Sequence, residues 1–250
     1  MSEVMHSARK ARDAVRARRP ENAKVTVMIP TLNEAGNLPY VLNTIPSWVD
    51  EVLIVDGRSG DDTERIANVL WPDVRIVHEL RPGKGVAMRT GFDAAKGDLV
   101  IALDADGSMD GSKIEEFRDK LVGGADYVKG SRFRHGAGSA DITPFRRFGD
   151  FGICALLFLL FGARYTDATY GYVGVWADSV EALGIDRDGF EVETLIGIRA
   201  RRARLRTAEV ACFESRRIHG RSNLNALRDG IKIFKLIVRE RTHRYRGPEH

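Results

Sequence analysis

Two aspartates, Asp104 and Asp106, stand directly after an apolar segment of the chain, with one residue between them. Carboxylates this close repel each other, which raises their pKa values unless a cation lies between them. A hard divalent ion such as Mg²⁺ or Mn²⁺ commonly bridges one or two carboxylates and a substrate phosphate. The pair therefore predicts a metal site. The alternative is a plain solvated turn, because Asp-x-Asp-Gly segments are common at strand ends.

A basic turn and a third aspartate strengthen the first interpretation. Lys84 follows Gly83 at the expected start of a helix, where backbone N–H groups and the helix dipole favour anions. The spacing of the glycines and the residue after the lysine differ from those of a Walker A loop. Asp56 ends another apolar segment and could accept a hydrogen bond from a base or a ribose. Together these residues indicate a site for a nucleoside diphosphate.

These residues follow segments that alternate between strand and helix patterns. Strand patterns cover 25–29, 51–55, 74–78 and 98–103, and helix patterns cover 34–46, the stretch after 61–63, and 84–96. The alternation predicts an α/β fold with a mainly parallel sheet flanked by helices. In such sheets ligands bind beyond the carboxyl ends of the strands, where Asp56, Asp104 and Asp106 stand.

The composition excludes several other classes of protein. The 250 residues are 43% hydrophobic and 30% charged, which rules out a disordered, collagen-like or disulfide-framework chain. Cys154 and Cys212 stand in apolar surroundings, so we expect two buried, reduced thiols. The N-terminus lacks the apolar region of a secretory signal, and the longest apolar run, 153–161, is too short to span a bilayer.

The net charge of +4 is unevenly distributed. Residues 1–24 carry 7 basic and 3 acidic side chains, residues 216–250 carry 10 and 3, and the stretch between them has a charge of −7. The chain has no nucleic-acid-binding motif, so the basic ends alone do not predict a nucleic-acid partner.

Several motifs, in order along the chain, resemble those of the family 2, GT-A-fold glycosyltransferases. They are Ile29–Glu34, Val55–Gly57 with Asp61–Thr63, Gly83–Gly85, Asp104–Asp106, Gly130–Arg132, Asp167–Tyr172, Gly189–Glu193 and Arg217–Asn223. Within that group the chain looks most like the polyprenyl-phosphate (dolichol-phosphate) mannosyl- or glucosyltransferase branch. The resemblance implies a GT-A catalytic domain over 24–215, after a basic N-terminal arm (1–23) and before a basic C-terminal helical segment (216–250).

The resemblance also implies roles for individual residues. The nucleotide pocket would be lined by Pro30, Leu32, Glu34 and Asp56. Asp106 would be the principal metal ligand, with Asp104 near the ribose and the metal, and Lys84 near the nucleotide or its phosphates. The acceptor phosphate would be held by Arg132, one of Arg146 and Arg147, Arg217 or Arg221, and Ser222. Two departures, Ser108 where the branch often has Gln and Asn223 where it commonly has Lys, weaken the acceptor assignment more than the donor assignment.

The expected reaction is the inverting, metal-dependent transfer of a hexose from a nucleotide sugar, of the GDP-mannose or UDP-glucose type, to a polyprenyl phosphate. A phosphate acceptor is already ionised and needs arginines rather than a base. One alternative is a soluble enzyme that acts on a hydroxyl of a small molecule or glycan, with Glu191 or Glu193 as the general base. Another is a nucleotide-sugar-binding protein without catalysis. A nucleotidyltransferase would be expected to show a different, Gly-rich signature early in the chain.

Two segments bear on localisation, which we expect to be cytoplasmic, either free in the cytoplasm or at the cytoplasmic face of the membrane. Residues 145–164 fit either a core helix or a helix in the membrane interface. Residues 224–239 form an amphipathic pattern, with basic residues on a stripe beside the apolar one, which consists of Leu224, Leu227, Ile231, Phe234 and Val238. This second helix could lie on an anionic bilayer or pack against the acidic body, and the two interpretations are compatible.

Overall fold

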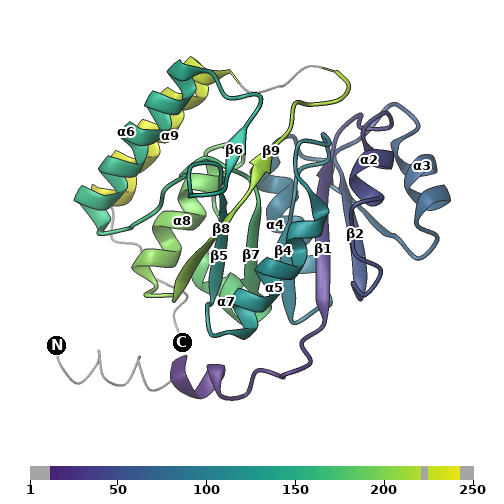
Figure 1. Ribbon diagram of the computed structural model, residues 1–250, viewed down its shortest axis with the longest axis horizontal. Coiled ribbons are helices and arrows are strands. Elements are labelled where there is room, and N and C mark those ends of the chain that lie inside the picture. Colours follow the sequence, from purple (N-terminus) through teal and green to yellow (C-terminus); the bar gives the residue numbers. More distant parts are fainter. Residues whose placement is uncertain (1–11, 221–224, 243–250) are drawn as a thin grey trace.

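The computed structural model describes residues 12–220 and 225–242. Its centre is a seven-stranded sheet in the order β3-β2-β1-β4-β7-β5-β8 (Figure 1). The strands are β1 (Val25–Thr31), β2 (Glu51–Asp56), β3 (Arg75–His78), β4 (Leu99–Ala102), β5 (Tyr127–Ser131), β7 (Val173–Trp176) and β8 (Thr207–Ala211). Only β7 is antiparallel to its neighbours, β4 and β5, so the expected mainly parallel sheet is confirmed.

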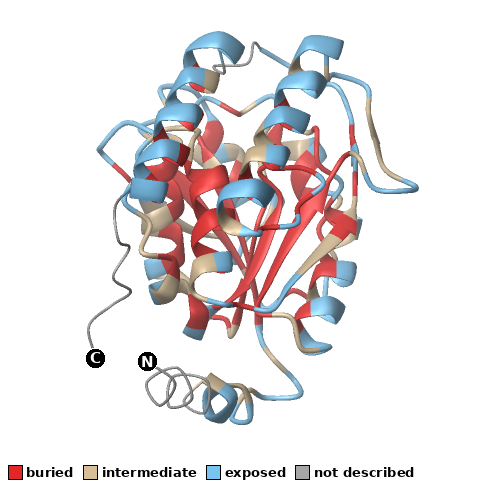
Figure 2. Cartoon of the chain, turned by 90° about the vertical axis from the view of Figure 1, so that its left-hand side faces the viewer, coloured by how far each residue is buried: buried red, intermediate tan, exposed pale blue. Residues whose placement is uncertain are grey.

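Helices cover both faces of this sheet, because the side chains of its strands alternate between two apolar clusters. In β1, Val27 and Ile29 belong to the cluster beneath α2 (Leu38–Leu42), α3 (Thr63–Leu70) and α5 (Ile114–Val122). Met28 points to the opposite cluster, which packs against α4 (Lys84–Ala94), α6 (Pro144–Phe161), α8 (Val192–Arg202) and α9 (Ala226–Thr242). Figure 2 shows the buried strands between these two layers.

The helix predicted over 34–46 is much shorter in the structure, where α2 covers Leu38–Leu42. Residues 34–37 form a turn instead, in which the N–H groups of Asn37 and Leu38 both donate to the carbonyl of Glu34 (2.9 Å). Pro39 has no N–H for a helical hydrogen bond and stands in the first turn of α2, where none is needed. The turn brings the Glu34 side chain to the carboxyl end of β1, which is where a ligand site is expected.

The remaining elements are short. They are a two-stranded parallel sheet of β6 (Gly138–Ser139) and β9 (Phe213–Glu214), the helix α7 (Ala177–Val180), and the 3₁₀ turns η1 (Gly111–Lys113) and η2 (Glu181–Leu183). The long helices α6 and α9 lie side by side at one edge of the molecule (Figure 1). The side chain of Thr143 caps α6 by accepting from the N–H of Arg146 (3.2 Å), and Gly162 ends the helix with a φ of 67°.

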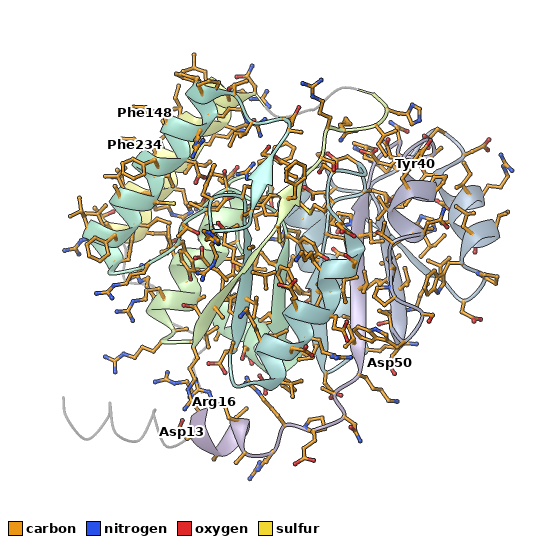
Figure 3. All side chains as sticks on the ribbon, viewed as in Figure 1. Asp13, Arg16, Tyr40, Asp50, Phe148 and Phe234 are labelled. Atoms are coloured by element: carbon orange, nitrogen blue, oxygen red, sulfur yellow. The ribbon has the colours of Figure 1, made fainter. Side chains whose placement is uncertain are left out.

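The described part of the N-terminal segment is bound to the body of the protein. Arg16 and Arg19 both donate to the buried carboxylate of Asp126, and Arg19 also reaches Asp178 (2.7 Å). Arg16 and Asp13 lie below the sheet in Figure 3. Part of the basic charge near the N-terminus is therefore compensated by carboxylates of the acidic body. In the described ranges, no helix combines the length and apolar character needed to cross a membrane.

Candidate functional site

A pocket of about 420 Å³ lies at the carboxyl ends of β1 and β4. This volume is within the range of small-molecule and cofactor sites. Ten residues expected from the sequence line it: Pro30, Leu32, Glu34, Lys84, Asp104, Asp106, Arg132, Arg146, Glu193 and Arg217. They come from positions as far apart as 30 and 217, which the parallel strands bring to one edge of the sheet.

At one wall of the pocket Lys84 bridges two carboxylates. Its Nζ lies 2.6 Å from Oδ1 of Asp104 and 2.5 Å from Oε1 of Glu193. Burial would lower the pKa of Lys84, but the charges of the two carboxylates raise it above its usual value. The pKa of Glu193 is also raised, mainly by burial, with the Lys84 charge opposing the rise.

Gly171 lets this lysine–carboxylate group form. A Cβ atom at position 171 would lie 2.7 Å from Oε1 of Glu193 and 2.8 Å from Nζ of Lys84. Carbon atoms do not approach polar side-chain atoms so closely, so any larger residue here would displace the group. The Asp167–Tyr172 motif therefore includes a residue whose lack of a side chain shapes the pocket.

Asp106 belongs to a second charged group, centred on Arg217. The two Nη atoms of Arg217 lie 3.1 Å from Oε1 of Glu34, and its Nε lies 3.6 Å from Oδ2 of Asp106. Burial raises the pKa of Glu34, although Asn37 and Arg217 oppose the rise. Asn37 also accepts from the N–H of His219 (2.8 Å), which holds the last described part of the Arg217–Asn223 motif over the pocket.

Arg132 has all its charge compensated within the protein. Its Nε and Nη2 donate to the two oxygens of Asp167 at 2.7 and 2.9 Å, and its Nη1 donates to Glu214 at 3.2 Å. The side chain is 3% exposed and that of Asp167 is 0% exposed. The resemblance implied an acceptor phosphate at Arg132, but these contacts assign the guanidinium to two carboxylates and fix the wall of the pocket.

The loop that carries Gly171 is held from two sides. The fully buried Lys129 of β5 donates to the carbonyl of Tyr170 (2.6 Å). On the other side Asp150 of α6 accepts from the backbone N–H (3.1 Å) and the hydroxyl (2.7 Å) of Thr169. Burial and the charge of Asp167 raise the pKa of Asp150. Helix α6 is thus connected directly to the loop that forms the pocket.

Several expected site residues lie elsewhere. Asp56 does not line the pocket: it is buried and accepts from the N–H of Ser59 (2.9 Å), so it shapes the loop that follows β2. Glu191, unlike Glu193, is not among the lining residues. Arg147 is exposed and stacks over the ring of Phe133, with 5.6 Å from Cζ to the centroid. Arg221 and Ser222 are outside the described residues.

Sequence reasoning missed two lining arginines, Arg58 and Arg81. Arg58 directly follows the Val55–Gly57 motif and Arg81 stands two residues before the Gly83–Gly85 motif, so their charge and position were the available signal. Arg58 has a φ of 69°, in the left-handed region, so the chain turns sharply after Gly57.

Among the described residues, one group of three potential metal ligands has its donor atoms within 4.8 Å of one another, namely Asp56, Glu64 and His78. This group is separate from the Asp104 and Asp106 pair.

Comparison with known proteins identifies the family. Residues 26–188 match the family described as "Glycosyl transferase family 2". The chain belongs to this family. Its strand order and helical layers are those of the GT-A fold. The expected family and fold are confirmed.

The similar proteins differ in how much of this chain and of their own length the match covers. An uncharacterized glycosyltransferase of Mycobacterium tuberculosis is 43% identical over 108 residues, which are 43% of this chain and 48% of that protein. The chain thus spans about half the length of this curated relative. The polyprenol monophosphomannose synthase of Mycolicibacterium smegmatis is 29% identical over 90% of this chain and 91% of its own. The glucosyl-3-phosphoglycerate synthase of M. tuberculosis has the same fold, with a TM-score of 0.70 at 22% identity, over 88% of this chain and 80% of that structure.

Proposed function

We propose that this protein transfers a hexose from a nucleotide sugar to a polyprenyl phosphate, with inversion at the anomeric carbon. The observation that carries the proposal is the pocket itself, in which an aspartate pair and several arginines face the same space. Carboxylates suit a metal–diphosphate and arginines suit a phosphate acceptor. The similarity to a polyprenol monophosphomannose synthase over nearly the whole chain supports the choice of acceptor.

The donor side fits a divalent ion such as Mg²⁺ or Mn²⁺. The side chains of Asp104 and Asp106 are 30% and 20% exposed, line the pocket and offer the hard oxygen donors that these ions prefer. When bound, such an ion would stabilise the negative charge of the leaving nucleoside diphosphate. Lys84 would add positive charge on the same wall, and Glu193 would hold Lys84 in place. Solved structures of glucosyl-3-phosphoglycerate synthase, which has the same fold, hold Mn²⁺ or Mg²⁺ together with UDP.

On the acceptor side, a phosphate monoester is already ionised near neutral pH and needs a cation to hold it. Arg146 is the best placed, because it lines the pocket and its side chain is 30% exposed. Its ion pair with Asp141 (3.3 Å) is exposed and therefore weak, so a phosphate can replace the carboxylate. We assign the acceptor phosphate to Arg146 with Arg58 or Arg81, and a positioning role to Arg132.

A second candidate is transfer to a hydroxyl of a soluble acceptor. The observation that favours it is Glu193, a carboxylate in the pocket with a raised pKa, as a general base requires. Its contact with Lys84 opposes this role, because a base that is held by a cation is a weaker proton acceptor.

The test uses the purified full chain with Mg²⁺ or Mn²⁺, a panel of GDP- and UDP-sugars, and either polyprenyl phosphate in detergent or soluble hydroxyl acceptors. We expect sugar transfer to the lipid phosphate that requires the metal. Asp106→Asn should lower turnover by about 100-fold or more, because it removes charge from the proposed metal site. Asp93→Asn, an exposed change on α4, is the matched control.

Three outcomes would contradict the proposal. Transfer to hydroxyl acceptors alone would favour the second candidate. Transfer that needs neither a metal nor a phosphate lipid would refute the assignment of both sides of the pocket. Nucleotide binding without turnover, unchanged by Asp106→Asn, would indicate a nucleotide-sugar-binding protein without catalysis.

A further inference from the structure

Helices α6 and α9 together present a large apolar surface, which we call the α6–α9 face. It consists of Phe145, Phe148, Phe151, Phe158, Leu159 and Leu160 of α6 and Leu227, Ile231, Phe234 and Val238 of α9. These are ten of the twenty exposed large apolar side chains in the described residues. Phe148 is 78% exposed, and Phe148 and Phe234 lie at the same outer edge of the molecule (Figure 3). Soluble proteins rarely expose so many neighbouring apolar groups without a partner.

The fold itself does not use this face. Helix α6 packs inward through Cys154 and Leu157, and α9 through Ile233, Leu236 and Ile237. The outer turns of both helices are exposed in Figure 2, which looks onto this side of the molecule. The apolar stripe expected on this helix begins at Leu224, which is outside the described residues. Its described part, from Leu227 to Val238, is a second apolar face of α9 in addition to the one that packs.

The exposed charge that α6 and α9 themselves carry has a single sign. The basic side chains on the two helices, all exposed except the half-buried Arg146, are Arg146, Arg147, Arg228, Lys232, Lys235, Arg239 and Arg241. The three acidic residues of these helices, Asp150, Asp229 and Glu240, are all buried. Glu240 pairs inward with Arg199 of α8 (3.0 Å), so packing on the body uses an acid of α9. An apolar face edged by cations is complementary to an anionic lipid surface.

The first turn of α6 connects this surface to the pocket. Arg146 belongs to that turn and also lines the pocket, and Asp150, one turn later, holds the loop that carries Gly171. Both helices begin at the end of the molecule where the parallel strands of the sheet end (Figure 1). A bilayer against the α6–α9 face would therefore bring lipid headgroups next to the pocket.

We propose that the α6–α9 face docks on an anionic phospholipid bilayer and so presents the pocket to a lipid-borne phosphate. This inference deepens the proposed function and rests on it for the identity of the acceptor. A second copy of the chain is a poorer occupant, because a two-fold interface sets each patch against its own copy and would bring the basic side chains together.

The test measures binding of the full chain to vesicles by flotation, without nucleotide or polyprenyl phosphate. The vesicles are phosphatidylcholine, either alone or with phosphatidylglycerol as about one lipid in three. We expect binding to the anionic vesicles that weakens in high salt and is much lower on phosphatidylcholine alone. The triple variant F148D/F151D/F234D should reduce the partition coefficient by about tenfold or more, because it places charge in the apolar face.

Controls separate docking from folding. Val69→Asp changes a side chain that is 68% exposed on α3, away from the face, and should leave binding unchanged. Circular dichroism and thermal unfolding should show that the triple variant keeps its fold, since the three side chains are exposed. A second variant, K232E/K235E, should lower binding to anionic vesicles while leaving the apolar face intact.

Several results would overturn the proposal. They are equal binding to both vesicle types, triple-variant binding as tight as that of the unchanged protein, and a dimer that the triple variant dissociates without any vesicle binding. The vesicles contain no acceptor, so binding can succeed even if the transferase assay fails. Transfer to detergent-dispersed polyprenyl phosphate without vesicle binding would reject this inference alone.

Discussion

Replacing Arg132 by methionine should destabilise the protein rather than remove an acceptor contact. The substitution leaves Asp167 and Glu214 without their cation, and the Asp167 side chain is fully buried. Removal of one partner from a buried ion pair typically costs about 3–5 kcal/mol of unfolding free energy. A change of 1 kcal/mol shifts the Tm of a domain of this size by about 2–4 °C, so we expect a fall of about 6–20 °C.

The assay is thermal unfolding followed by circular dichroism, with steady-state kinetics of the transferase reaction below the lowered Tm. Arg65→Met, which breaks an exposed ion pair with Asp62 on α3, is the control and should leave the Tm unchanged. Arg132→Lys should recover part of the stability, because it restores the charge without the planar fork. A positioning role predicts that donor and acceptor KM change together.

The reasoning would be refuted if Arg132→Met kept its Tm within about 2 °C of the unchanged protein, since a buried, uncompensated Asp167 could not cost so little. A selective rise in the acceptor KM at unchanged Tm would place the acceptor phosphate on Arg132 instead. That result would restore the role implied by the family resemblance.

Three further predictions concern the pocket and the body. Gly171→Ala should lower kcat about 100-fold or more in the transfer assay while the fold persists by circular dichroism, because the new Cβ would displace the lysine–carboxylate group. Burial raises the pKa of Asp126, but hydrogen bonds from Arg16 and other groups outweigh burial and hold this pKa below the usual 3.8. The ionised carboxylate therefore stabilises the fold above pH 3.8, and this stabilisation is lost as the pH falls through the lowered pKa. Urea unfolding should therefore show Arg16→Met less stable at pH 7, with the difference shrinking below about pH 4. Burial raises the pKa of Cys212 to about 12, so this thiol should stay unlabelled by a disulfide reagent at pH 8 until the protein is unfolded, and rapid labelling of the native protein would contradict its burial.

Local patterns along the chain were sufficient for most of the sheet. The strand predicted over 51–55 is observed as Glu51–Asp56, because a short apolar segment between polar turns has few other ways to bury both faces. The helix predicted over 34–46 was wrong in length, because Pro39 has no N–H for a helical hydrogen bond and is tolerated only in the first turn, so that α2 begins at Leu38.

The sequence by itself determined the family, the alternation of strands and helices, and the presence of aspartates at the ends of β2 and β4. Only the tertiary structure decided that Glu193 rather than Glu191 faces the pocket, and that Arg132 is already paired. It also decided that α9 has a second apolar face on the outside. The physical reason is that burial and charge compensation depend on which distant residues meet, and no local spacing carries that information.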